Sequence, residues 1–223
     1  MESLCGFLLI ILDTEKVYVD ITTKIAAEFG KTYSWEIEFK IMGKKETEAA
    51  KAIIDALELP ITVDEFLERS HAEQNRLFPL VPLMPGADKL VRHLHKCNVP
   101  IAVATGSNTQ SFALKSSGHK EFFSLFHHTV LSGDDPEVEH GKPAPDCFLL
   151  AAKRFKDSPD PAKVLVFEDA PNGVDAAHAA GMQCVWVPHD EQDHNTHKHK
   201  CTQILDNLEN FIPESFGLPA YTS

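Results

Sequence analysis

Three short polar segments carry the residue types that phosphoryl chemistry needs. Glu168 and Asp169 are adjacent carboxylates between an apolar run and a helical pattern, and such hard oxygen ligands suit Mg²⁺. Thr105-Gly106-Ser107 offers hydroxyls, a flexible glycine and free N–H groups of a helix start, a combination that binds phosphate. Lys142, in the loop His140-Gly-Lys-Pro143, adds a cation. Together they predict chemistry on a small phosphorylated metabolite.

Each segment taken alone has a simpler structural interpretation. Paired acids at a helix start commonly complement the helix dipole. A Thr-Gly-Ser turn is a frequent helix N-cap, and a loop lysine is usually solvated. Only the common position of the three segments, each following a predicted strand, favours a chemical role.

The elements expected around these segments alternate between strand and helix. Residues 7–12 form an apolar run without helical period, which predicts a strand buried on both faces. Alternating strands and helices predict an α/β fold with a doubly wound parallel sheet, whose function lies at the carboxyl ends of its strands. Further strands are predicted at 99–104, 129–131, 164–167 and 183–187, and helices at 87–96, 107–117, 145–155 and 172–180.

The stretch after the first strand is almost entirely helical. Apolar residues recur every four positions from Val17 to Phe29, and further helices are predicted at 45–57 and, behind the N-cap Thr62, at 63–78. We therefore predict an α-helical cap at 14–83, inserted into an α/β core made of 1–13 and 84–223.

Composition limits the partners of the protein. Its 223 residues include 21 Lys and Arg against 33 Asp and Glu, a net charge of −12, which disfavours nucleic acids and anionic membrane surfaces. The longest apolar run has six residues, too few to span a bilayer. Five widely spaced cysteines fit reduced thiols. We expect a cytoplasmic monomer with neither nucleic-acid nor membrane partners.

Longer stretches resemble the haloacid dehalogenase-like (HAD) hydrolases. Thr105, Lys142 and the Glu168-Asp169 pair stand in the order of that family's second, third and fourth motifs. Within the family, the segments 119–126 and 166–173 are most similar to the pseudouridine-5'-phosphatases and their insect relatives. The resemblance extends from about residue 10 to the C-terminus.

The resemblance implies a Mg²⁺-dependent phosphatase that forms a phosphoaspartate, with a modified nucleoside 5'-monophosphate such as pseudouridine 5'-phosphate as substrate. It assigns Thr105 to hold the transferring phosphoryl group and Lys142 to offset its charge. Asp169, assisted by Glu168, would hold the metal. The cap pair Gly43-Lys44 would face the substrate.

The first motif of the family, Asp-X-Asp-Gly, is missing from this chain. Counting back from Asp13, in the shared segment Asp13-Thr-Glu15, puts Gly6 at the nucleophile position and Leu8 at the acid/base position. Neither residue can attack phosphorus or transfer a proton. Asp13 lies seven residues beyond Gly6, about 23 Å along a strand, so we expect no substitute from it.

We therefore predict a HAD phosphatase scaffold whose hydrolysis is lost or strongly impaired. One alternative is a non-catalytic pseudophosphatase that binds a phosphorylated ligand or a protein, or an isoform with an alternative N-terminal segment. The competing hypothesis is an active enzyme with its nucleophile elsewhere.

A histidine-rich stretch follows the last predicted strand. Its imidazoles, carboxylates and thiol could bind Zn²⁺ or Ni²⁺, although a solvated loop is the simpler interpretation. The residues concerned are His189, Asp190, Asp193, His194, His197, His199 and Cys201.

Overall fold

The computed structural model describes the main chain of residues 6–9 and, with side chains, residues 11–41, 44, 46–189 and 195–221. The chain divides into two compact units. The first combines Met1–Ile11, Leu83–Ala113 and His119–Ser223, and the second combines Leu12–Pro82 with Leu114–Gly118.

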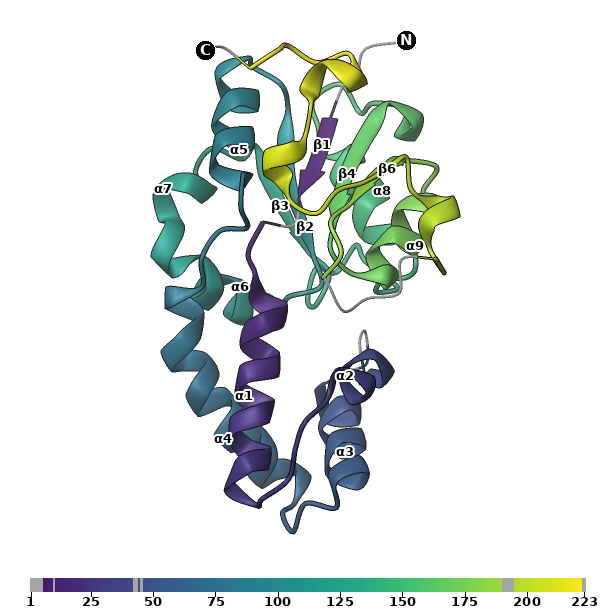
Figure 1. Ribbon diagram of the computed structural model, residues 1–223. Coiled ribbons are helices and arrows are strands. Elements are labelled where there is room, and N and C mark those ends of the chain that lie inside the picture. Colours follow the sequence, from purple (N-terminus) through teal and green to yellow (C-terminus); the bar gives the residue numbers. More distant parts are fainter. Residues whose placement is uncertain (1–5, 10, 42–43, 45, 190–194, 222–223) are drawn as a thin grey trace. The chain divides into compact units, whose positions relative to one another are not determined.

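A six-stranded sheet forms the centre of the first unit (Figure 1). Its strand order is β3-β2-β1-β4-β5-β6 and every neighbouring pair is parallel, which confirms the predicted doubly wound α/β fold. β6 was not predicted, because two residues carry no periodic signal. The strands are β1 Gly6–Leu9, β2 Ile101–Thr105, β3 His128–Leu131, β4 Val164–Glu168, β5 Gln183–Trp186 and β6 Gln203–Ile204.

Helices cover both faces of this sheet, which explains why its strands are apolar without interruption. Ile101 and Val103 of β2 pack in one core with α5 (Ala87–Lys96). Ala102 and Ala104 point the other way and pack with α8 and α9. The remaining helices of the unit are α6 Thr109–Ser116, α7 Lys120–Phe123, α8 Asp146–Lys153 and α9 Pro171–Ala179.

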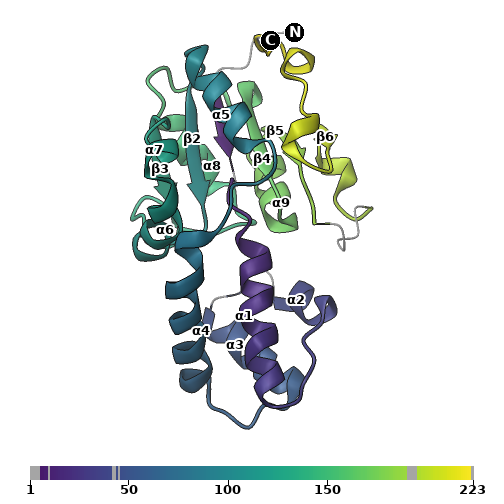
Figure 2. The same cartoon turned by 60° about the vertical axis from the view of Figure 1, so that its left-hand side comes forward.

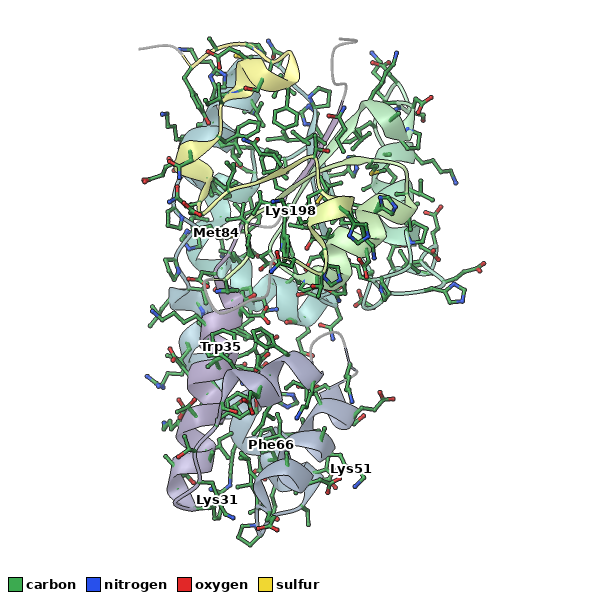
Figure 3. All side chains as sticks on the ribbon, turned by 45° about the vertical axis from the view of Figure 1, so that its right-hand side comes forward. Lys31, Trp35, Lys51, Phe66, Met84 and Lys198 are labelled. Atoms are coloured by element: carbon green, nitrogen blue, oxygen red, sulfur yellow. The ribbon has the colours of Figure 1, made fainter. Side chains whose placement is uncertain are left out.

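The second unit is a helical bundle with its own core. The helix α4 lies beside α1 (Figure 2), and Phe66 of α4 is 4% exposed among the helices, whereas Lys51 of α3 points outward (Figure 3). The helices are α1 Thr14–Glu28, α2 Trp35–Ile41, α3 Glu46–Leu57 and α4 Val63–Leu77. No helix in the described residues is long and apolar enough to cross a membrane.

The helix α2 lies in the stretch predicted to be almost entirely helical, although no separate helix was predicted there. Its apolar residues Trp35, Ile37, Phe39 and Ile41 alternate with polar ones, a period of two that is typical of strands. The segment nevertheless folds as a helix, and Phe39 is consequently left 39% exposed.

Leu114–Gly118 joins the helical unit, although our predicted domain bounds place it in the α/β core. The ammonium of Lys115 lies over the rings of Tyr18 and Phe78, at 5.1 and 5.0 Å from their centroids. Such cation–π contacts stabilise a buried cation that has left water.

The predicted N-cap of α4 is confirmed and gives a stability prediction. Thr62 Oγ1 accepts a hydrogen bond from the Glu65 N–H at 3.2 Å, and the Glu65 carboxylate accepts one from the Thr62 N–H at 2.8 Å. We expect Thr62→Ala to lower the free energy of unfolding by about 1 kcal/mol in urea denaturation followed by helical circular dichroism. Thr62→Ser, which keeps the accepting oxygen, should stay close to the natural protein; equal losses in both variants would contradict the capping role.

Candidate active site

The three predicted polar segments meet at the carboxyl edge of the sheet. Thr105 ends β2 and Glu168 ends β4, the two strands that flank β1, so these strands lie about 10 Å apart. Lys142, from the loop before α8, reaches both. Its Nζ donates to the Ala104 carbonyl at 3.2 Å and to Glu168 Oε1 at 2.5 Å.

Lys142 is the centre of this arrangement and is not solvated. Its side chain is only 7% exposed, and its Nζ lies 4.5 Å from the ring centroid of Phe148. Burial alone lowers the pKa of Lys142, but the Glu168 carboxylate outweighs burial and raises that pKa above its ordinary value. The ammonium is therefore a fixed positive charge at the edge of the sheet.

Glu168 occupies a space that a glycine leaves open. A Cβ atom on Gly173, in the first turn of α9, would lie 2.0 Å from the Glu168 carboxyl carbon. The Glu168 side chain is fully buried; burial raises its pKa to about 7, and Lys142 opposes that rise. Its second oxygen, Oε2, is buried without a hydrogen-bond partner.

Asp169 lies beside Glu168 and is held through its main chain by β5. The Trp186 indole N–H donates to the Asp169 carbonyl at 2.9 Å, and the Val187 N–H donates to the Glu168 carbonyl at 2.7 Å. Burial raises the pKa of the Asp169 carboxyl, while the charges of Lys142 and His189 oppose the rise. Sequence reasoning missed Trp186, because an indole inside an apolar strand looks like core.

The Thr105-Gly106-Ser107 turn differs from expectation at its helix start. Thr105 Oγ1 accepts the Ser107 N–H at 3.2 Å, and a Cβ on Gly106 would meet open space. The helix α6 begins at Thr109, however, and not at Ser107.

The expectation of free N–H groups at that helix start is wrong for two of them. The Thr109 N–H donates to the Asp134 carboxylate at 2.9 Å, and the Ser111 N–H donates to Asn108 Oδ1 at 2.8 Å. Asn and Asp side chains commonly satisfy helix starts in this way. The Asn108 signal was available in the sequence, whereas Asp134 is brought in only by the fold.

The register of β1 places Gly6 and Leu8 away from this site. Gly6 pairs with Val164 at the amino end of β4, and Leu8 pairs with Val166. Gly6 is thus four residues before the level of Glu168, about 13 Å along the strand. Counting in the sequence put Gly6 at the nucleophile position, but pairing with two neighbours fixes the strand in a different register.

Leu9, the last residue of β1, pairs with Val103 and with Phe167. Ile11 lies beyond the end of β1, and its carbonyl accepts a hydrogen bond from the Met84 N–H at 2.8 Å. Ile11 is 3% exposed and packs in the apolar core with Val103 and Phe167. From Gly6 to Leu12 the sequence contains no carboxylate, so the central strand brings no acid to the site.

The carboxylate oxygens of Glu168 and Asp169 are the groups at this edge of the sheet that could bind a divalent cation. Lys142 holds Oε1 of Glu168, which leaves the unpartnered Oε2 of Glu168 and the carboxylate of Asp169. Two carboxylates, with water or substrate oxygens completing the shell, match the usual binding mode of Mg²⁺.

The remaining predicted site residues lie in the cap and in the histidine-rich stretch. Of that stretch, His189 lies beside Asp169, with potential ligand atoms of the two side chains within 4.8 Å of each other. Gly43 lies outside the described residues, and Lys44 is exposed in the helical unit. In the histidine-rich stretch, Asp190, Asp193 and His194 also lie outside the described residues. Among the residues described there, His197, His199 and Cys201 form no three-ligand metal group, and His197 lies 3.4 Å from Asp175 instead.

Comparison with known proteins agrees with this arrangement. Residues 10–181 match the haloacid dehalogenase-like hydrolase family. The chain belongs to that family. (DL)-glycerol-3-phosphatase 2 of Arabidopsis thaliana is 47% identical over 95% of this chain and 89% of its own length. A Drosophila melanogaster protein named probable pseudouridine-5'-phosphatase is 45% identical over 96% of this chain and 92% of its own.

Solved structures confirm the HAD fold. A β-phosphoglucomutase from Clostridium difficile superposes with a TM-score of 0.72 at 18% identity, covering 97% of this chain and 96% of its own. A HAD hydrolase from Entamoeba histolytica gives 0.73 at 19% identity, covering 97% of each chain. The predicted resemblance to HAD hydrolases is therefore confirmed, and this chain is a HAD-family phosphatase by descent.

Removing Lys142 tests the buried charge pair. The folded-state pKa of Glu168, about 7, lies above its ordinary 4.5, so the folded protein holds this proton more tightly and loses stability as pH rises between those values. Without Lys142 that pKa rises further. We expect Lys142→Met to cost about 3–5 kcal/mol of unfolding free energy near pH 8 and much less near pH 5, measured by urea denaturation.

The double variant Lys142→Met with Glu168→Gln provides the matched control. This double variant removes both charges. The loss of unfolding free energy should therefore no longer differ between pH 5 and pH 8. If Lys142→Met lowered the unfolding free energy equally at both pH values, the result would contradict a buried, charge-dependent pair.

Proposed function

We propose that this chain is a HAD-family phosphatase scaffold that binds a small phosphomonoester with Mg²⁺ and has lost most or all of its hydrolytic activity. The observation that carries the proposal is the composition of its central strand. No residue from Gly6 to Leu12 carries a carboxylate, and the register of β1 places Gly6 at the amino end of the sheet.

The binding half of the proposal rests on the groups around Lys142. Thr105 and Ser107 supply hydroxyls at the end of β2, Gly106 leaves open space beside them, and Lys142 supplies a desolvated ammonium. One ammonium beside two carboxylates cannot by itself balance a phosphate dianion. Asp169 and Glu168 would hold Mg²⁺, which when bound supplies the positive charge that admits the phosphate.

The chemical half of the family reaction lacks its groups. A phosphoaspartate requires a carboxylate to attack phosphorus, and protonation of the leaving alcohol requires an acid. Thr105 can position the phosphoryl group and Lys142 can offset its charge, but neither replaces the missing carboxylates. In a protease example, removal of the nucleophile lowered turnover by roughly six orders of magnitude.

The relatives narrow the proposed ligand to two candidates. Phosphatases named for glycerol 3-phosphate and for pseudouridine 5'-phosphate are 47% and 45% identical to this chain. Both compounds carry the phosphate on a primary carbon. The next carbon bears a hydroxyl group in the first compound and the ring oxygen in the second. We propose pseudouridine 5'-phosphate as the first ligand to test and glycerol 3-phosphate as the second.

Restoring an acid tests both the loss of hydrolysis and the register of β1. We expect the natural chain to release no phosphate above background from either compound with Mg²⁺. Ile11→Asp introduces an aspartate two residues beyond the end of β1 and, by sequence, recreates Asp-X-Asp with Asp13. Gly6→Asp with Leu8→Asp and Leu9→Gly instead recreates the family motif by sequence count.

The outcomes of this assay separate the hypotheses. Turnover by the Ile11 variant alone would support the register in the structure, and turnover by the triple variant alone would support the sequence count. Ile11→Asn, which has the same shape but no carboxylate, is the matched control, and circular dichroism checks the fold of each variant. Turnover by the natural chain at the rate of an intact phosphatase would overturn the proposed loss.

The role of Asp169 in Mg²⁺-dependent binding can be measured without turnover. We expect Mg²⁺ to strengthen binding of pseudouridine 5'-phosphate to the natural chain in calorimetric titrations, and Asp169→Asn to reduce that gain by about tenfold or more. The control Asp157→Asn changes an exposed carboxylate outside the site and should leave binding unchanged. If Mg²⁺ strengthened ligand binding equally in both variants, the result would contradict a role of Asp169 in binding the metal.

A further inference from the structure

Two cysteines of the α/β unit are in contact, although they are seventeen positions apart in the sequence. Cys184 lies in β5 and is fully buried, and Cys201 follows the short helix Lys198–Lys200 and is half-buried. Their thiols are hydrogen-bonded to each other. Both are free in the structure.

The main chain around the two cysteines holds this contact in place. The Thr202 N–H donates to the Cys184 carbonyl at 2.8 Å, and the Cys184 N–H donates to Thr202 Oγ1 at 3.1 Å. The pairing continues into the sheet with Val185 opposite Gln203. The thiols therefore meet within an ordered ladder.

The surroundings make the two thiols unequal. Cys201 Sγ donates to the His197 carbonyl at 3.4 Å. The hydrogen bond from Cys184 lowers the pKa of Cys201 and outweighs burial and Asp175, which both raise that pKa. The same bond and burial raise the pKa of Cys184. Because a thiolate is the reactive form and exposure gives access, Cys201 is the thiol that an oxidant meets first.

We propose that Cys184 and Cys201 form a peroxide-sensitive dithiol that closes to a disulfide, with Cys201 as the attacking and Cys184 as the resolving cysteine. The Cys201 thiol releases its proton and the thiolate attacks one peroxide oxygen. An S–O bond forms, the O–O bond breaks, and the leaving hydroxide takes up that proton and becomes water. The Cys184 sulfur then attacks the Cys201 sulfur, the S–O bond breaks, and the Cys184 proton leaves with the second hydroxide as water. Two thiols are oxidised and one peroxide is reduced to two waters.

The other described cysteines lack this arrangement. Cys147 is fully buried. Cys97 is half-buried like Cys201, but its recorded neighbour is the His93 ring, 4.0 Å from its sulfur. Cys97 is therefore the matched control: it is exposed to a similar degree as Cys201, but its neighbour in the structure is not a thiol.

Closure would link β5 to the segment that leads into β6. A disulfide stabilises a fold mainly by restricting the unfolded chain, and a loop of about seventeen residues is long enough for a measurable gain. We expect the oxidised protein to unfold several degrees higher than the reduced protein, about 5 °C or more for a chain of this size.

The test is peroxide treatment of the full chain, followed by peptide mapping without reductant. We expect a peptide pair linked through Cys184 and Cys201 that disappears with dithiothreitol, together with the rise in melting temperature. Cys97→Ser should behave like the natural chain. Absence of the linked pair under peroxide that oxidises Cys97 would overturn the proposal.

Single substitutions test the assigned order of attack. In Cys184→Ser the resolving thiol is gone, so Cys201 should accumulate as a sulfenic acid that dimedone traps. In Cys201→Ser the buried Cys184 should give no dimedone adduct. Equal trapping at both cysteines, in variants that keep the natural circular dichroism spectrum, would contradict the order.

Discussion

The buried ion pair between Lys142 and Glu168 is the constraint on which the candidate site depends. A lysine and a glutamate that leave water together must contact each other and find further polar partners, because an unpaired charge in a protein interior is strongly unfavourable. Here the ammonium also binds the Ala104 carbonyl, and the carboxylate sits over Gly173. One pair thus fixes β2, β4, α9 and the loop before α8 relative to each other.

This constraint explains how an acidic protein would hold the phosphate proposed above. The chain carries a net charge of −12, so the field over most of its surface repels phosphate. Lys142 supplies a positive charge that solvent does not screen. The Trp186 indole N–H holds the Asp169 carbonyl, a contact that does not occupy the Asp169 carboxylate. The chain therefore keeps the framework of residues that the sequence resemblance assigns to the second, third and fourth motifs of its family.

The central strand is where the chain departs from that framework. The strand β1 pairs with β2 and β4 as the fold requires, because an apolar segment buried on both faces satisfies the sheet whatever its chemistry. The same segment provides only main-chain groups at the edge where the family reaction needs carboxylates. The proposed loss of hydrolysis therefore requires no change in how the strand packs, because a fold can persist without the chemistry of its family.

Much of the fold and part of the site followed from the sequence alone. Unbroken apolar runs gave β2 to β5, helical periodicity gave α1, α3 and α4, and Thr62 gave a helix start, since each signal is local. The helix α2 had no separate signal, because its apolar residues alternate instead of recurring at helical spacing. Residue type and position in the sequence selected Thr105, Lys142, Glu168 and Asp169, which the structure brings to one edge of the sheet; their roles stay predictions. Tertiary structure alone decided that Lys142 is buried, that Asp134 takes a helix N–H, that Cys184 meets Cys201, and that Gly6 lies at the amino end of the sheet. Burial, partner choice and strand register depend on contacts between distant segments, and no local pattern encodes them.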